Sequence, residues 1–139
     1  TLENHGARNL PPILGTRRVY GLEVAGSWPA IQTEINGGAL AITQATGRVP
    51  QWYRGAAGLY TPSVVPLIEA MGVRVAGYSL NSDEGAGLPA AIVQARIEAA
   101  RDGDVIEGHI NQPKRASGAG IAAGLAALQQ SGAQFVGLS

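Results

Sequence analysis

Short apolar segments alternate with helical segments along the whole chain, and this alternation restricts the folds that it can adopt. Strands are predicted at 51–54, 73–80, 104–108 and 134–138, and helices at 28–45, 62–71, 88–101 and 117–130. Only a few residues separate each helix from the next strand, so successive strands run parallel through right-handed crossovers. The sequence therefore predicts an α/β fold with a parallel sheet.

Polar turns follow three of the predicted strands. They carry Arg54, Asp83 and His109, while His5 lies in a motif near the start of the chain. In a parallel sheet or barrel, the residues that carry chemistry gather at the carboxyl ends of the strands. An imidazole, a carboxylate that orients it and a guanidinium that binds an anion are suited to acid–base chemistry. We predict that the four lie on one face. Any one of these residues alone is better explained by a structural role in a loop, but the four together favour a functional site.

Size and composition exclude several classes of protein. The 139 residues fit one domain, predicted to span 1–139, and 45% of them are hydrophobic. No apolar run approaches the roughly 18 residues of a membrane helix. Ten basic and ten acidic residues give zero formal net charge, without a basic cluster, so nucleic acid is not expected as a partner. The absence of cysteine excludes disulfides and thiolate metal sites.

Two further features of the sequence can each be interpreted in two ways. His5 and Asn9 are four residues apart, a spacing at which two side chains can chelate a metal, although Asn is a weak neutral ligand and a plain loop is commoner. Strand alternation places Glu107 on the face of His109, and an inward carboxylate must be paired or protonated. Glu107 is either an ion-pair partner of Arg54 or a functional acid, and both interpretations stay open.

The glycine-rich segment 118–124 is similar to a dinucleotide-binding turn. A polar loop separates it from the preceding strand, however, and no acidic residue follows at the required distance. We therefore interpret it as the start of a helix whose small residues allow close packing. A second glycine pair, at 37–38, interrupts the apolar spacing of the first predicted helix.

Taken in order, these motifs resemble the carboxyl-terminal half to two-thirds of a polysaccharide deacetylase (NodB-homology) domain. Segment 3–9 is similar to the family's His-Ser/Thr-x-x-His motif, 52–58 to its Arg-Pro-Pro-Tyr-Gly motif, 81–83 to its aspartate motif, and 103–109 to its last motif, Gly-Asp-Ile-hydrophobic-Leu-His. The resemblance implies a distorted (β/α) barrel whose first strand and first motif would precede Thr1. We expect an upstream amino-terminal segment or another chain to complete it.

The resemblance also implies a function: a hydrolase that removes an acetyl group from an N-acetylated carbohydrate with the help of a divalent metal, expected to be zinc. It implies periplasmic or extracellular location, since such proteins are often exported. The implied metal ligands are His5 and Asn9, and the implied general acid is His109, oriented by Asp83. Arg54 would pair with a catalytic base. The substrate contacts would come from Ala57, whose backbone N–H would help hold the oxyanion, Tyr60 and Leu80.

Three departures from the family pattern leave other functions open. Asn9 stands in place of the second histidine, residues 55–57 replace Pro-Pro-Tyr, and Glu107 replaces an aliphatic residue of a kind that often lines the acetyl pocket. One alternative is a metal-independent hydrolase of a non-sugar amide or cyclic ureide. The other is a degenerate, non-catalytic barrel that binds glycan or protein.

Overall fold

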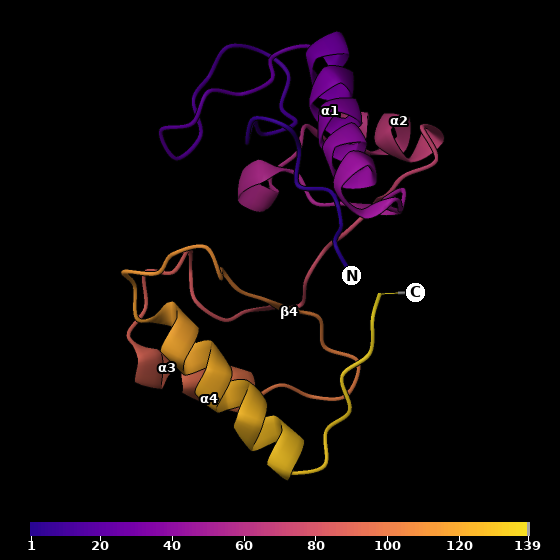
Figure 1. The fold of residues 1–139 in the computed structure, drawn as a ribbon. Coiled ribbons are helices and arrows are strands. Elements are labelled where there is room, and N and C mark those ends of the chain that lie inside the picture. The colour runs from indigo at the N-terminus through magenta and orange to yellow at the C-terminus, as the bar shows by residue number, and fades with distance from the viewer. Residues whose placement is uncertain (139) are drawn as a thin grey trace. The chain divides into compact units, whose positions relative to one another are not determined.

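The computed structural model describes residues 1–138, and the chain divides into two compact units, Thr1–Gly77 and a second that begins at Tyr78 (Figure 1). Each unit contains helices and one pair of parallel strands. Parallel pairing confirms the prediction made from the alternation of strands and helices. A closed barrel remains an expectation, because the two strand pairs belong to separate two-stranded sheets.

Helix α1 (Trp28–Thr46) is the longest element of the first unit. Ser27 caps its first turn through its side chain, and Gly47 ends it with a left-handed φ of 71°. Ile31 and Ile35 lie one turn apart on the buried face. The helix matches the predicted 28–45 within one residue.

The glycine pair does not interrupt α1. A Cβ on Gly37 would lie 2.9 Å from the Cβ of Ala7, and one on Gly38 would collide with Oδ1 of Asn4. These two glycines therefore allow the amino-terminal segment to pack against the helix backbone.

The remaining elements of the first unit are short. They are strand β1 (Trp52–Tyr53), the 3₁₀ turns η1 (Ala56–Gly58) and η2 (Pro62–Val64), helix α2 (Val65–Ala70) and strand β2 (Arg74–Val75). Strands β1 and β2 pair in parallel. The core is made by apolar side chains of these elements and of α1: Ile31, Ile35, Tyr53, Val64 and Ile68.

The predicted strand 73–80 is wrong as a single element. Its two ends belong to different strands, β2 in the first unit and β3 (Leu80–Asn81) in the second, with no strand at 76–79. The unit boundary at Gly77 falls within it. Apolar β-branched residues predict strand character, but they do not show where a chain leaves one sheet and enters another.

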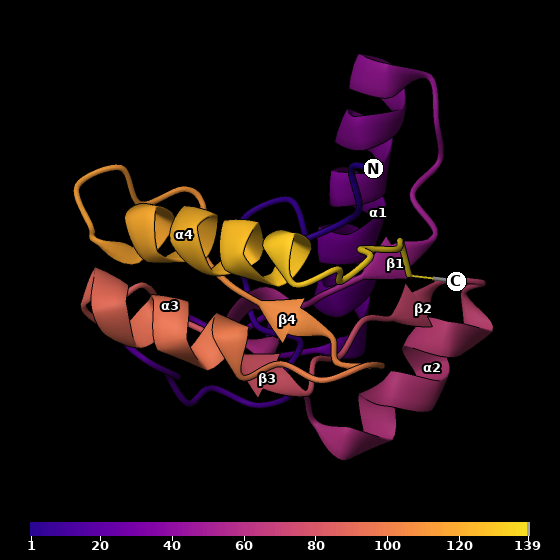
Figure 2. The ribbon, with the colours of Figure 1, turned by 90° about the horizontal axis from the view of Figure 1, so that it is seen from below.

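The second unit places two helices beside a parallel strand pair. Strand β4 (Ile106–Glu107) pairs with β3, and helices α3 (Ala90–Glu98) and α4 (Ser117–Gln130) lie side by side (Figure 2). Gly120 and Gly124 of α4 face α3, where an added Cβ would approach within 2.6 Å of Val93 and 2.7 Å of Ile97. The interpretation of this segment as a closely packed helix is confirmed.

The final predicted strand, 134–138, is wrong: these residues form no regular element and are exposed. A terminal apolar run has strand propensity, but without a neighbour its backbone groups have no ladder to join. None of the helices in residues 1–138 is long and apolar enough to cross a membrane.

Candidate active site

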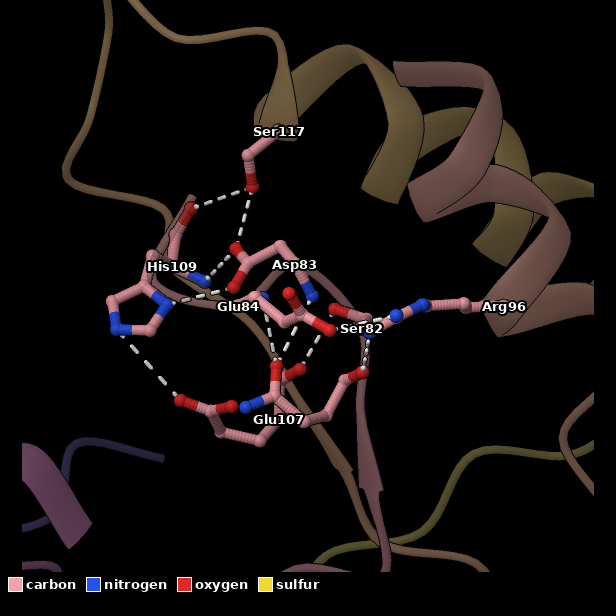
Figure 3. A network of polar contacts seen from close by, with 8 residues as sticks. Ser82, Asp83, Glu84, Arg96, Glu107, His109 and Ser117 are labelled. Atoms are coloured by element: carbon pink, nitrogen blue, oxygen red, sulfur yellow. Dashed lines mark hydrogen bonds and ion pairs between the residues drawn. The ribbon is translucent and has the colours of Figure 1, made fainter. Parts of the chain in front are cut away.

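The two strands of the second unit bring Asp83 and His109 together. Asp83 follows β3 by two residues, and His109 follows β4 by two residues. The strands are neighbours and parallel, so their carboxyl ends open at the same edge. The aspartate and the imidazole that were predicted from separate motifs therefore lie in contact (Figure 3).

Asp83 is fully buried, and both of its carboxylate oxygens accept hydrogen bonds. Oδ1 lies 2.9 Å from Nδ1 of His109, while Oδ2 accepts the backbone N–H of His109 at 2.7 Å and the hydroxyl of Ser117 at 2.6 Å. Burial by itself would raise the pKa of Asp83. The hydrogen bonds from Ser117 and His109, with one from the backbone of Ala86, outweigh it and lower the pKa from 3.8 to about 2.

The ionised Asp83 sets the orientation and the tautomer of His109. A carboxylate can only accept, so Nδ1 of the imidazole carries its hydrogen and donates it to Asp83. The remaining ring nitrogen, Nε2, is then the atom that can give or take a proton. The His109 side chain is 37% exposed, so a bound molecule can reach it.

The turn that presents Asp83 is held from both sides. Asn81 accepts the backbone N–H groups of Asp83 and Glu84 with its side-chain oxygen. Arg96 of α3 donates to the backbone oxygen of Asn81 at 3.2 Å and pairs with Glu84 at 2.7 Å (Figure 3). These contacts stabilise the turn that places Asp83 against the imidazole.

Glu107 approaches the other side of the imidazole. Its Oε1 lies 3.7 Å from Nε2 of His109, and its side chain is 12% exposed. The prediction that this carboxylate shares a face with His109 is confirmed. Asp83, Glu107 and His109 each bring one potential metal-ligand atom within 4.8 Å of the others. Within this group, both oxygens of Asp83 are hydrogen-bonded to His109 or Ser117, and Nδ1 of His109 is hydrogen-bonded to Asp83.

In the first unit, His5 and Arg54 also meet at a strand end. Asn4 bridges Tyr53 of β1 in parallel, and the next residues along each segment are His5 and Arg54. Nδ1 of His5 lies 2.6 Å from the backbone oxygen of Arg54. A carbonyl oxygen only accepts, so Nδ1 carries the hydrogen and Nε2 keeps the lone pair that a metal ligand needs.

The loop between His5 and Asn9 is held by Glu34 of α1. Glu34 is 1% exposed, and its Oε1 accepts the backbone N–H groups of Arg8 at 2.7 Å and Leu10 at 3.1 Å. Asn9 is exposed and has a left-handed backbone, with φ of 62°. An asparagine tolerates this conformation better than most residues.

The predicted substrate contacts lie in both units. In the first, Ala57 is exposed and left-handed, with φ of 62°, and the Arg54 guanidinium lies over Gly58. Tyr60 is half-buried, accepts the backbone N–H of Gly55 at 2.7 Å, and packs edge-to-face on Tyr53. Its pKa is raised by burial, against the opposing hydrogen bond from Gly55 and the charge of Arg54. Leu80, in the second unit, is half-buried in β3.

Sequence reasoning missed two residues that shape these sites, Ser117 and Glu34. A serine at the start of a helix is ordinarily interpreted as a cap. Here the cap position belongs to Ala116, and the Ser117 hydroxyl serves Asp83 instead. Glu34 occupies an apolar helix face, and that position is the only signal that could have marked it as a buried, paired carboxylate.

Solved structures of family 4 carbohydrate esterases (CE4) share this fold. Peptidoglycan deacetylase PdaC from Bacillus subtilis aligns with 75% of this chain and 50% of its own, at 20% identity and a TM-score of 0.60. A family 4 carbohydrate esterase from Streptomyces lividans, solved in complex with acetate, aligns with 72% of this chain and 51% of its own, at 19% identity and a TM-score of 0.60. A CE4 family pseudoenzyme from Bacillus anthracis aligns with 94% of this chain and 42% of its own, at 13% identity and a TM-score of 0.67.

The resemblance to polysaccharide deacetylases is thus confirmed at the level of the fold, and it is consistent with a carboxyl-terminal portion of that domain. This chain spans about half of the length of the esterase structures. The sequence itself matches no protein family profile and no curated protein.

Proposed function

We propose that this chain is part of a carbohydrate N-deacetylase, a hydrolase that removes an acetyl group from an N-acetylated sugar. The observation that carries the proposal is the Asp83–His109 pair at the carboxyl ends of two parallel strands, with a hydrogen bond of 2.9 Å between them. The fold of the CE4 structures supports it. A barrel completed by an upstream segment or another chain, and an extracellular or periplasmic location, belong to the same proposal.

His109 acts as the general acid. Its Nδ1–H is held by Asp83, so proton transfer takes place at Nε2. When the carbon–nitrogen bond of the substrate breaks, the leaving nitrogen takes the proton from Nε2. Asp83 orients the ring and fixes its tautomer, as a buried carboxylate does for a catalytic histidine.

The other predicted residues bind substrate or hold charge. Arg54 pairs with a catalytic base, and the backbone N–H at Ala57 helps stabilise the oxyanion. Tyr60 and Leu80 contact the sugar and its acetyl group. Tyr60 suits this role because a half-buried aromatic ring offers an apolar surface beside a polar group.

A divalent metal such as zinc would polarise the acetyl carbonyl and lower the pKa of a bound water. His5 fits as a ligand, because its Nδ1 hydrogen bond leaves the Nε2 lone pair available. Asn9 offers only a neutral amide oxygen. A catalytic zinc site takes three protein ligands, and these two do not complete one. The mechanism proposed for this chain therefore rests on His109 and Asp83 and assigns no step to a metal.

Acetate release from N-acetylglucosamine oligomers tests the proposal. We expect His109→Ala to reduce kcat at least about 100-fold, the usual contribution of a general acid, with unchanged circular dichroism. The matched control is Asp102→Asn, which changes an exposed side chain of the same unit that has no assigned role and leaves the general acid in place. Normal activity per folded molecule in His109→Ala would refute the assigned role. Turnover of cyclic ureides or simple amides in place of sugars would point to the metal-independent amidase.

A second candidate is a non-catalytic glycan-binding domain. The neutral Asn9 favours it, and one structure of the same fold is described as a CE4 family pseudoenzyme. This candidate predicts affinity for N-acetylglucosamine oligomers without acetate release, even at high protein concentration with added zinc or cobalt.

A further inference from the structure

Glu107 occupies the space in front of the reactive nitrogen of His109. Each ring nitrogen of His109 lies near a different carboxylate, Nδ1 near Asp83 and Nε2 near Glu107. Asp83, on the Nδ1 side, is fully buried and accepts hydrogen bonds from the backbone and ring of His109 and from the hydroxyl of Ser117. Glu107, on the Nε2 side, lies at an ion-pair distance of 3.7 Å (Figure 3).

A group that takes a proton from Nε2 can contact Glu107 at the same time. Proton transfer requires the two heavy atoms to approach to about 2.6–3.2 Å. Since Oε1 of Glu107 lies 3.7 Å from Nε2, one atom can lie about 3 Å from both at the same time. A leaving atom at this position contacts the acid and the carboxylate together.

The nature of that atom decides whether the contact is favourable. The nitrogen of a secondary amide carries a hydrogen that it can donate to Glu107. The bridging oxygen of an ester has only lone pairs to present to the carboxylate. A site that offers a hydrogen-bond acceptor to a substrate N–H discriminates strongly against the analogue that lacks it.

We propose that Glu107 is a specificity-determining residue that makes this site select amides over esters. The inference rests on the proposed function and names the bond that it cleaves. In the step concerned, the tetrahedral adduct of water and the acetyl carbon collapses: the carbon–oxygen double bond re-forms, the carbon–nitrogen bond breaks and its electron pair goes to nitrogen. Nitrogen then takes the proton from Nε2 and leaves as a primary amine, while its original N–H stays hydrogen-bonded to Glu107.

The test compares N-acetyl and O-acetyl derivatives of the same sugar in the wild-type protein, Glu107→Leu and Glu107→Gln. We expect the ratio of kcat/KM for amide over ester to fall about 100-fold or more in Glu107→Leu. Glu107→Gln keeps an acceptor oxygen without the charge, so its ratio should lie between the two. Glu98→Gln, an exposed carboxylate on α3, is the charge-matched control and should keep the wild-type ratio. Equal losses on both substrates, or an unchanged ratio, would overturn the inference.

If the protein hydrolyses neither substrate, the proposed function is refuted, but the role of Glu107 is not. A binding measurement then tests whether Glu107 selects the amide. Each of the two sugars is titrated into the protein, and binding is monitored through the NMR signals of the His109 ring. We expect wild-type protein to bind the amide about tenfold more tightly than the ester, the effect of one charge-assisted hydrogen bond. Glu107→Leu should lose this preference. Equal affinities in the wild-type protein, or binding of neither sugar, would overturn the inference.

Discussion

Asp83 is buried and ionised at the same time because its hydrogen-bond donors replace the water that it lost. Its pKa of about 2 in the folded protein lies below the unfolded value of 3.8. A lowered pKa in the folded state stabilises the fold above the unfolded pKa, and this contribution is lost as the pH falls from about 4 toward 2. The difference corresponds to roughly 2 kcal/mol.

We therefore expect the free energy of unfolding of the wild-type protein to fall by about 2 kcal/mol more than that of Asp83→Asn between pH 4 and pH 2. Urea denaturation at a series of pH values measures the difference. Asp102→Asn, an exposed aspartate of the same unit, controls for the loss of one negative charge. Parallel pH profiles for wild type and Asp83→Asn would contradict the role assigned to the hydrogen bonds.

Asn9 is the residue that most weakens the predicted metal site, and its backbone allows a direct test. Histidine, like asparagine, is enriched at positive φ, so Asn9→His should fit φ of 62° with little added strain. We expect this substitution to raise the affinity for zinc at least about tenfold, because imidazole is a far better ligand than a neutral amide.

Isothermal titration calorimetry with zinc measures this affinity. The double variant Asn9→His with His5→Ala is the control and should lose the gain, since one histidine cannot chelate. Unchanged affinity in Asn9→His would show that His5 and residue 9 do not bind one ion together.

At the scale of elements, the contact between α3 and α4 depends on two glycines of α4. A Cβ at Gly124 would lie 2.7 Å from Cβ of Ile97 and 3.1 Å from the backbone oxygen of Gln94. These neighbours belong to the face of α3 and cannot move without separating the helices. We expect Gly124→Ala to lower the free energy of unfolding by about 1–3 kcal/mol.

Gly118→Ala is the matched control, because it lies in the same helix with nothing within 4 Å of an added Cβ. Alanine there should stabilise the protein by up to about 1 kcal/mol, through lower chain entropy in the unfolded state. Thermal denaturation of both variants gives the comparison. A loss of similar size at the two positions would mean that helix packing is not the cause.

At the scale of the whole molecule, charge gives the clearest expectation about partners. Zero formal net charge, with ten basic and ten acidic residues, provides no surplus of cations for phosphate contacts. We expect no binding to DNA or RNA at physiological salt, measured by fluorescence anisotropy with a labelled duplex and a labelled single strand. Micromolar affinity that falls steeply with added salt would contradict this expectation.

The sequence predicts some elements of the fold at their observed bounds and others wrongly. Helix α4 was predicted at its observed bounds, because a polar turn before it and a change of period after it mark both ends. The segment 73–80 failed, since each half is apolar and β-branched whether or not the chain changes sheets. Residues 134–138 failed for a related reason: strand propensity is realised only where a partner strand is available.

The sequence by itself determined the alternation of helices and parallel strands, the strand-end positions of Asp83 and His109, and the face shared by Glu107. These follow from local periodicity, which each segment carries alone. Only the tertiary structure decided that Ser117 serves Asp83 and that Glu34 holds the loop after His5. Both contacts join residues more than twenty positions apart, and the hydrogen-bond partner of a polar side chain depends on which segments packing brings beside it.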